Sequence, residues 1–560
     1  MATVRIQNAT VWTGLRLPGG DISVTDAVLI EQGSILAVGA TAKRLPADVV
    51  IDAAGGFICY GFGDGHVHPV FGGLEQQFAP VRELQSVEEI ACAVGEWAAL
   101  HPDAEWIRGE GFDQTLAPDG VFLAAWLDAV VADRPVFLRA SDYHTVWVNS
   151  EALRRAGYTR DLVQPHDGEI VIGTTGEPTG TLREWGAWSP VYALMPPIEL
   201  ETRMRAIAHA SECFAAAGLT WVQDAWVETT EVNTWIEADR RGLVTCKVAM
   251  ALWADSNNWR QQLDEFVEAR ARVEEAGSPR LVANTIKFFA DGVIESATGA
   301  LLEPYCDCPH SKGLPNWQPD ELKSAVAAVD SLGFQTHIHA IGDGAARMAL
   351  DAIEYASMVN GARDRRPVIA HTQLVDRADI GRFSELGVIA NFEPYWAKFD
   401  SCQSELTAPR LGTERTNRQY LIGTILRSGA HISFGSDWPV TTYSPLAGIQ
   451  VAVTRKMIAA GPAWMPQECI TVEEALLAYT FGVAFQAGDD SAGVIRPGAR
   501  ADLVWLAVDP RAVDPNEIEN IAVLGTWASG QRVWQAGEAV HFFHVDGDET
   551  RQRAHGFNGR

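Results

Sequence analysis

Two histidines separated by one residue, His66 and His68, give the chain its first chemical signal. They end an apolar run that starts at Phe62 and is typical of a β-strand. Because successive side chains of a strand point to opposite faces, His66 and His68 share one face and can close on a single ion. Imidazole is the commonest metal-binding side chain, yet two histidines on a strand also occur as ordinary half-buried polar residues. The pair predicts a metal site that other residues must complete.

Further metal-competent side chains stand at or near the ends of later apolar runs: Lys287, His337, His339, His371 and Asp437. Each has an ordinary explanation when taken alone. A histidine can be a hydrogen-bonded polar residue, Lys287 can be half of a buried ion pair, and Asp437 can cap a turn. Independent residues of that kind would not be expected to fall repeatedly at strand ends. The repetition therefore indicates one shared site.

Apolar runs and amphipathic helical patterns alternate along most of the chain. The expected strands are 57–63, 220–226, 247–253, 283–289, 335–339, 367–371, 388–392 and 431–436, and helical periodicity predicts helices at 202–217, 258–275, 320–332, 344–358 and 376–386. Eight strands that alternate with helices predict a TIM-type (β/α)8 barrel of the α/β class. Chemistry in such a barrel lies at the carboxyl ends of the strands, where the metal-competent residues fall.

The spacing of the strands predicts the domain organisation. The gap between the first two strands is too long for a simple loop, so residues 75–200 are expected to be an inserted lid or substrate subdomain over the barrel mouth. The barrel itself comprises 57–74 and 201–487. Short alternating runs at 1–56 and 488–540 predict antiparallel strands from both chain ends that build one small β-sandwich, followed by a tail at 541–560. An insertion that only stabilises the fold or mediates oligomerisation is the alternative.

Composition excludes several classes of partner. The 560 residues carry a formal charge of −28, which opposes binding to nucleic acid or to an anionic membrane surface. With 47% hydrophobic and 21% charged residues, the chain is globular rather than disordered. Neither a basic and apolar leader nor an uninterrupted apolar span is found, and the eight cysteines are scattered. These features predict a cytoplasmic protein that acts on a small molecule.

Several motifs together resemble the amidohydrolase superfamily, and more narrowly its family 3 branch, over nearly the whole chain. The matching segments are Gly63-Asp64-Gly65-His66-Val67-His68, Lys287 to Glu295, His339-Ala340-Ile341-Gly342-Asp343, Gly435-Ser436-Asp437-Trp438-Pro439-Val440, and Trp147 to Leu153 in the insertion. Cys59-Tyr60-Gly61 departs from the superfamily pattern, which commonly has proline before the glycine. The resemblance implies a distorted barrel with a terminal β-sandwich, and homodimerisation is plausible from the family alone.

The resemblance also implies a ligand for each position of a metal centre. His66, His68 and Asp437 would hold the more buried ion, and His339 and His371 a second ion. Lys287, if carboxylated to N6-carboxylysine, would bridge the two, since its amine can be made neutral by burial. Whether one or two ions bind stays open; zinc is favoured, with manganese or iron as alternatives. His337 shares a strand face with His339 and competes with it, although the segment after His339 matches the family.

The implied chemistry is hydrolysis of an amide. A divalent metal lowers the pKa of its bound water and polarises a carbonyl, and the resulting hydroxide attacks the carbon. Asp437 would act as general base and then as acid toward the departing nitrogen, beside His339 and His371. Aromatic residues expected near the mouth, together with His144, suggest an apolar or aromatic substrate held by stacking: Trp147, Tyr395, Trp396 and Trp438. Packing between insertion and barrel is the competing explanation for them.

The preferred specific substrate is a small N-substituted amide such as an N-substituted formamide, because the chain resembles the deformylases of that branch. An aminohydrolase (deaminase) or a cyclic-amide hydrolase on the same scaffold is the enzymatic alternative, since a metal centre does not identify the group attached to the carbonyl. A catalytically silent binding or assembly protein is the alternative outside enzymes.

Overall fold

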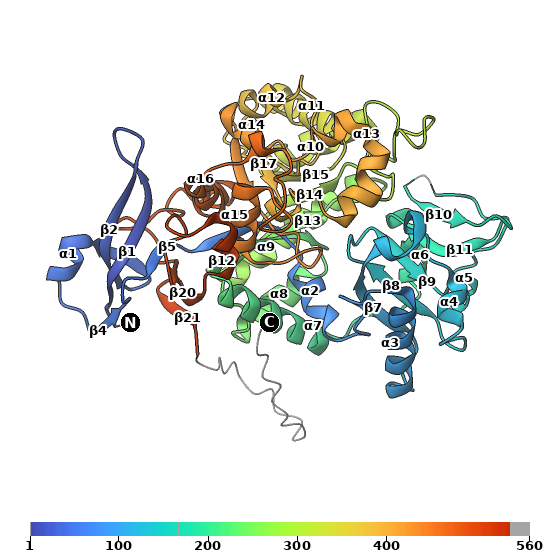
Figure 1. Ribbon diagram of the computed structural model, residues 1–560, viewed down its shortest axis with the longest axis horizontal. Coiled ribbons are helices and arrows are strands. Elements are labelled where there is room, and N and C mark those ends of the chain that lie inside the picture. The colour runs from blue at the N-terminus through green and yellow to red at the C-terminus, as the bar shows by residue number, and fades with distance from the viewer. Residues whose placement is uncertain (1, 166, 538–560) are drawn as a thin grey trace.

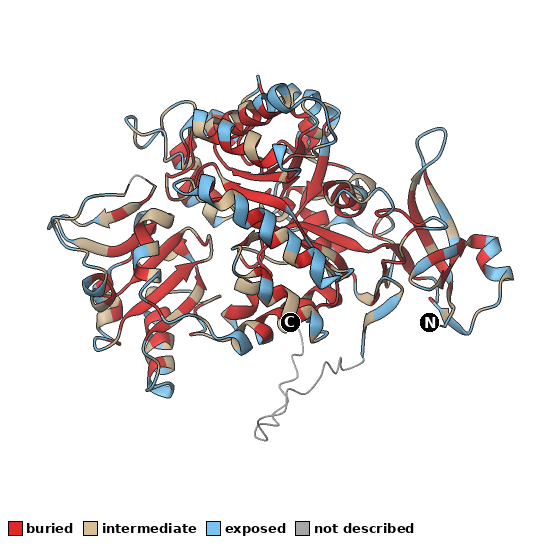
Figure 2. Cartoon of the chain, turned by 180° about the vertical axis from the view of Figure 1, so that it is seen from behind, coloured by how far each residue is buried: buried red, intermediate tan, exposed pale blue. Residues whose placement is uncertain are grey.

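The computed structural model describes residues 2–165 and 167–537 of the chain. Three bodies follow one another in Figure 1: a terminal sheet, a central barrel and an inserted subdomain on the side of the barrel away from that sheet. Buried residues are concentrated along the barrel strands (Figure 2). No helix in the described part of the chain is long and apolar enough to span a membrane. The predicted tail at 541–560 lies outside the described residues.

The barrel consists of eight parallel strands in the order β6-β12-β13-β14-β15-β16-β17-β18. They are β6 (Phe62–Val67), β12 (Leu219–Val227), β13 (Lys247–Trp253), β14 (Leu281–Phe289), β15 (Gln335–Ala340), β16 (Val368–His371), β17 (Ile389–Phe392) and β18 (His431–Phe434). Fully buried Ile, Val, Phe and Ala residues dominate them, as is typical of parallel strands covered on both faces. The (β/α)8 fold class is confirmed.

Helices follow the strands and cover the barrel. They include α2 (Pro69–Glu75), α7 (Leu200–Ala216), α8 (Val232–Arg240), α9 (Trp259–Ala276), α10 (Pro319–Ser331), α11 (Asp343–Asn360), α12 (Ile380–Glu385), α13 (Ala408–Thr416), α14 (Ile422–Arg427), α15 (Pro445–Thr454), α16 (Val472–Leu477) and α17 (Val483–Gln486). Their apolar faces join the barrel strands in one hydrophobic core. The five predicted helices each match one of these, within a few residues for all but the shorter α12.

The prediction for the first barrel strand is wrong in its boundaries. The predicted strand 57–63 divides at Gly61 into β5 (Phe57–Tyr60) and β6. β5 pairs with β1 and β19 in the terminal sheet, and only β6 pairs with β12 in the barrel. Both runs are apolar and buried, so periodicity alone cannot tell which sheet each one joins. The change from terminal sheet to barrel therefore falls near Gly61 rather than before Phe57.

Both chain ends build the terminal sheet, as expected. Its strands are β1 (Val4–Arg16), β2 (Ile22–Glu31), β3 (Ser34–Val38), β4 (Val49–Asp52), β5, β19 (Leu503–Leu506), β20 (Val523–Ala528) and β21 (Gln531–Gln535), with helix α1 (Gly39–Arg44) between β3 and β4. Residues from both ends, such as Ile58 and Leu503, share one apolar cluster. The pairing is not wholly antiparallel, because β4 and β5 run parallel to β1.

The insertion forms a separate mixed sheet in the order β10-β11-β9-β8-β7. Its elements are α3 (Val87–Leu100), β7 (Ile107–Phe112), α4 (Ala124–Asp128), β8 (Val136–Ala140), β9 (Thr145–Val148), α5 (Ser150–Arg155), β10 (Glu169–Ile172), β11 (Pro178–Arg183) and α6 (Trp185–Tyr192). Trp147 is fully buried inside it. Its ring lies 5.0 Å from that of Phe122, and its Nε1 donates to the carbonyl of Leu123 at 3.0 Å.

We predict that Trp147→Ala destabilises the insertion without changing substrate affinity. Removing a fully buried indole from a packed core costs about 3–5 kcal/mol, whereas Trp147 lines neither cavity beside the candidate metal centre. Urea unfolding followed by near-UV circular dichroism measures the loss of stability. The KM of any amide that the protein hydrolyses measures the substrate affinity. Trp97→Ala, at a half-buried indole of α3, is the control and should cost less. A large rise in KM with unchanged stability would place Trp147 at the substrate instead.

Candidate metal centre

The first and the last barrel strand meet through backbone and side-chain hydrogen bonds. The carbonyl of His66 accepts from the amides of Ser436 (3.2 Å) and Asp437 (2.8 Å). The buried carboxylate of Asp64 accepts from the backbone amide of Ser436 (3.0 Å) and from its hydroxyl (2.5 Å). The amide of His68 donates to the carbonyl of Trp438 at 2.8 Å. We call this contact of residues 64–68 with 435–438 the seam, and it fixes His66, His68 and Asp437 relative to one another.

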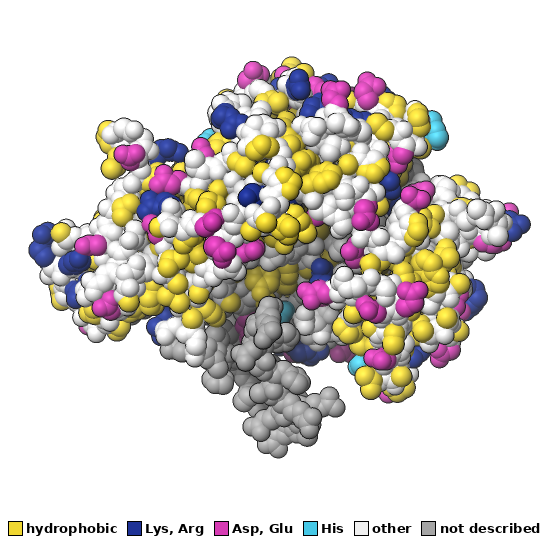
Figure 3. All heavy atoms as spheres, viewed as in Figure 1, with side chains coloured by type: hydrophobic (Ala, Val, Ile, Leu, Met, Phe, Trp, Pro, Cys, Tyr) yellow, Lys and Arg dark blue, Asp and Glu magenta, His cyan; other side chains and the backbone are white. Residues whose placement is uncertain are grey.

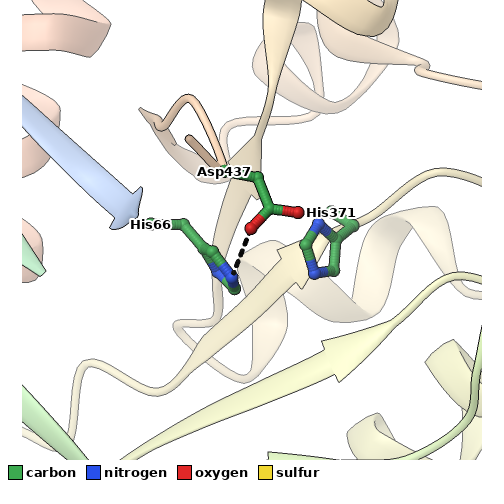
Figure 4. Close-up of side chains that lie close together, drawn as sticks. All are labelled: His66, His371 and Asp437. Atoms are coloured by element: carbon green, nitrogen blue, oxygen red, sulfur yellow. Dashed lines mark ion pairs between the residues drawn. The ribbon is translucent and has the colours of Figure 1, made fainter. Parts of the chain in front are cut away.

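Donor atoms of three buried residues gather at the carboxyl end of the seam. One donor atom from each of His66, His371 and Asp437 lies within 4.8 Å of the others, close enough to share a metal ion. Their side chains point toward one another in Figure 4, where a dashed line joins His66 to Asp437. His66 Nε2 lies 3.5 Å and His68 Nε2 3.0 Å from Asp437 Oδ1. Four of the six predicted ligands thus lie at one place.

Lys287 lies beneath this group. It is completely buried, and its Nζ is 3.5 Å from His66 Nε2. Burial lowers the pKa of Lys287 to about 7, against the opposing effect of the Asp437 and Glu393 carboxylates. A lysine amine that is largely neutral near pH 7 is the form that can react with carbon dioxide or bind a metal.

The two histidines of β15 occupy different positions. His337 Nε2 lies 2.8 Å from His66 Nδ1, so His337 orients the ring of His66 and lines neither cavity. His339 lines both cavities, and its ring centroid lies 4.4 Å from that of His371. This placement favours His339 as the ligand and leaves His337 as a supporting partner of the kind that metal-binding imidazoles commonly have.

His371 is oriented by a carboxylate that the sequence reasoning did not select. Its Nδ1 lies 3.0 Å from Oε2 of Glu393, which is completely buried at the end of β17. The other ring nitrogen of His371, Nε2, is therefore available to bind a metal ion together with His66 and Asp437. The backbone φ angles of His371 and Asp437 are 70° and 52°, values that non-glycine residues rarely adopt and that cluster at functional sites.

The donor set fits a divalent cation. Asp437 Oδ1 and His68 Nδ1 are buried without a hydrogen-bond partner, although His68 Nε2 is only 3.0 Å from that oxygen. Burial lowers the pKa of His66 and of His339 well below the usual value, so their imidazoles are neutral and can donate a lone pair. Neutral imidazoles around a buried carboxylate form a donor set of the kind that zinc binds.

Asp291 supports the centre from outside. Its carboxylate accepts from the backbone amides of Ala300 (2.7 Å), Ile341 (3.0 Å) and Gly342 (2.9 Å). These bonds tie the segment after β14 to the segment after β15, and so hold Lys287 and His339 in register. Asp291, which belongs to the Lys287–Glu295 motif, therefore stabilises the backbone around the site through these hydrogen bonds.

The predicted substrate residues divide into two groups. Tyr395, Trp396 and Trp438 line a cavity at the metal centre, and Trp396 stacks on the ring of His371 at 5.5 Å. His144 also lines this space, whereas Trp147 lies in the core of the insertion. Burial lowers the pKa of His144, but the nearby Glu184 carboxylate acts in the opposite direction, and the net result is a pKa raised to about 9. His144 is therefore a cation at neutral pH, with Glu184 Oε2 at 2.8 Å from its Nδ1.

Sequence reasoning missed several residues of the site. Glu184 joins His144 to Thr298, whose hydroxyl donates to Glu184 Oε1 at 2.5 Å, and thereby fastens the insertion to the barrel. Nothing in its sequence neighbourhood signals this role. Glu393, Trp226 and Trp253, in contrast, stand at the ends of predicted strands, so the rule that chemistry lies at strand ends would have selected them.

Comparisons with known proteins agree with this geometry. Residues 49–534 match the model of the amidohydrolase family. The Arabidopsis thaliana protein LONG AFTER FAR-RED 3 is 29% identical over 95% of this chain and 92% of its own length. The N-substituted formamide deformylase of Arthrobacter pascens is 26% identical over 91% of this chain and 94% of its own length. An uncharacterized metal-dependent hydrolase from Pyrococcus furiosus superposes with a TM-score of 0.68 at 26% identity, over 91% of this chain and 100% of its own.

A (β/α)8 barrel whose strand ends gather histidines, a lysine and an aspartate defines a metal-dependent hydrolase. The chain belongs to the amidohydrolase family, whose model matches most of its length. It is accordingly a hydrolase that acts on carbon–nitrogen bonds other than peptide bonds.

Glu393→Gln should weaken metal binding. The change keeps the shape of the side chain but removes the carboxylate that orients His371, and loss of such an outer partner typically costs about 10–100-fold in metal affinity. Competition for zinc with a chromogenic chelator measures the affinity. Glu468→Gln is the matched control, since this buried glutamate bonds Thr424 away from the site. Equal affinities of the wild type and the Glu393 variant would exclude this role.

Proposed function

We propose that the protein hydrolyses a small N-substituted amide, with an N-substituted formamide as the preferred substrate. The observation that carries the proposal is the clustering of His66, His371 and Asp437 donor atoms at the barrel mouth, next to a cavity with aromatic walls. The relative named N-substituted formamide deformylase supports this choice of substrate. A homodimer and a cytoplasmic location stay predictions.

The proposed ligands follow the strand ends. His66, His68 and Asp437 would hold one ion, His339 and His371 a second, and a carboxylated Lys287 would bridge them. Zinc suits this nitrogen and oxygen set, and manganese or iron could replace it. When bound, such an ion lowers the pKa of a water molecule and polarises a carbonyl group.

The side chains supply the remaining steps. Asp437 lies at the centre of the group and would accept a proton from the attacking water at its carboxylate, then deliver it to the amide nitrogen as the carbon–nitrogen bond breaks. The imidazolium of His144 would donate a hydrogen bond to the carbonyl oxygen, where negative charge develops. The insertion at 75–200 would close over the substrate, because Tyr143, His144 and Trp185 from it line the space above the metal centre.

Asp437→Asn should abolish turnover while most of the metal remains bound. Asparagine keeps an oxygen at this position but cannot shuttle a proton, and loss of a general acid–base typically costs about 10²–10⁴-fold in rate. Release of formate gives kcat, and inductively coupled plasma mass spectrometry gives the metal content. Asp351→Asn, on the exposed face of α11 beside Arg382, is the control. Near-normal activity of the Asp437 variant would remove this residue from the mechanism.

A panel of compounds tests the substrate class. Purified, zinc-loaded protein is incubated with N-substituted formamides, other acyl amides, cyclic amides and aminated heterocycles, and formate, amine and ammonia are measured. We expect formate and amine from the formamides. Ammonia from heterocycles alone, or ring opening of cyclic amides alone, would replace the proposal by one of the alternatives on the same scaffold. A metal-free protein that hydrolyses none of the panel would indicate a binding protein.

A further inference from the structure

Two cavities of very different size adjoin each other at the candidate metal centre. His339, His371 and Asp437 line both of them. The first, which we call the narrow chamber, has a volume of about 70 Å³, and the second, the wide cavity, about 710 Å³. The narrow chamber has room for only a few water molecules. A substrate whose reacting carbon lies at the metal centre therefore borders one small space and one much larger space.

Aromatic side chains from several elements close the narrow chamber. Trp226 is the next-to-last residue of β12, and its ring lies 5.8 Å from Trp253 at the end of β13, 5.7 Å from Trp185 of the insertion and 5.0 Å from Phe289 at the end of β14. Phe289 in turn lies 5.3 Å from the ring of His339. Two of these contacts are edge-to-face and two are tilted, and a bulky acyl group would have to displace one of the packed rings to enter this part of the chamber.

The wide cavity has a different character. It extends from the metal centre between α2, the insertion and the segment after β17, and it includes the predicted substrate residues Tyr395, Trp396 and Trp438. Carboxylates of Glu295 and Asp400 also line it, as does Glu75, which pairs with the guanidinium of Arg82. A wall of this kind offers aromatic faces to an apolar group and negative charge to a protonated amine. On the face of the molecule seen in Figure 3, by contrast, acidic and basic side chains are interspersed rather than gathered into one patch.

The geometry of an amide distributes its two arms between these spaces. The amide group is planar and prefers the trans form, so the acyl group and the N-substituent project in opposite directions from the carbon–nitrogen bond. With the carbonyl carbon at the metal centre, the two arms can occupy different spaces, one in the narrow chamber and the other in the wide cavity. Only the wide cavity has room for a large arm.

We propose that the narrow chamber receives the acyl group and the wide cavity receives the N-substituent, so that the enzyme accepts small acyl groups on large, preferably aromatic or cationic, amines. Trp226 and Phe289 set the upper limit on acyl size. This inference rests on the proposed amide hydrolysis and deepens it, since it names the arm of the substrate that each cavity recognises. The amine product leaves through a cavity whose carboxylates stabilise its positive charge.

Two substrate series test the assignment. In the first, the amine is kept as 2-phenylethylamine and the acyl group grows from formyl through acetyl to isobutyryl. In the second, the formyl group is kept and the N-substituent grows from methyl through butyl to naphthylmethyl. We expect kcat/KM to fall at least about 100-fold along the first series and to change less than about tenfold, or to rise, along the second. The opposite pattern, or equal tolerance on both sides, would overturn the assignment.

A variant of Trp226 tests whether this residue sets the upper limit on acyl size. Trp226→Ala should raise the ratio of kcat/KM for the isobutyryl amide to that for the formyl amide at least tenfold, because it opens the end of the narrow chamber. Trp97→Ala removes an indole from α3, far from both cavities, and should leave this ratio unchanged. Tyr395→Ala should alter selectivity only along the N-substituent series. A changed N-substituent selectivity in the Trp226 variant would contradict the proposal.

Binding separates this inference from the proposed function. Formate, acetate and isobutyrate are titrated into zinc-loaded wild type and Trp226→Ala by isothermal titration calorimetry. We expect the wild type to bind isobutyrate at least tenfold more weakly than formate, and the variant to lose most of that difference. If no amide is hydrolysed but this size limit appears, the proposed function fails and the assignment of the narrow chamber stands. If formamides are hydrolysed and the size limit is missing, the function stands and the assignment fails.

Discussion

The hydrogen-bonded seam between the first and the last barrel strand is the constraint on which the metal centre depends. Asp64 and Ser436 are joined through both backbone and side chain, and the carbonyl of His66 receives the amide of Asp437. Side chains alternate along a strand, so a shift of one residue would turn His66 away from Asp437. The barrel is thus closed and its ligands are aligned by the same few bonds.

Burial at this point has an electrostatic consequence. It lowers the pKa of Lys287 to about 7 and the pKa of His66 and of His339 well below the usual value, so these three side chains offer neutral nitrogen atoms near the Asp437 carboxylate. A protein interior accepts such a group when a cation completes it. The proposed ligands lie in or just after β6, β15, β16 and β18, whereas β12 and β13 present indoles that line the narrow chamber.

Seven of the eight barrel strands and the grouping of His66, His68, His371 and Asp437 could be predicted from the sequence, because long alternating elements and metal-competent side chains at strand ends leave strong local patterns. The misplaced boundary at Gly61 reflects two apolar runs that look alike but join different sheets. The contact of Trp185 with Trp226 and the bond of Glu184 to Thr298 connect the insertion to the barrel, and such long-range contacts have no local signature. Trp147 shows the reverse case, in which a residue within a family motif serves packing.

The two halves of the seam lie far apart in the sequence, and this separation bears on when the metal centre can form. Asp64 and Ser436 are 372 positions apart in the sequence. At a synthesis rate of about 5–20 residues per second, roughly 20–75 s pass between the first and the last ligand. During that interval His66 and His68 have already been made while Asp437 has not. The complete proposed ligand set therefore exists only near the end of translation, so an ion that needs all of these residues would bind late in synthesis or after it.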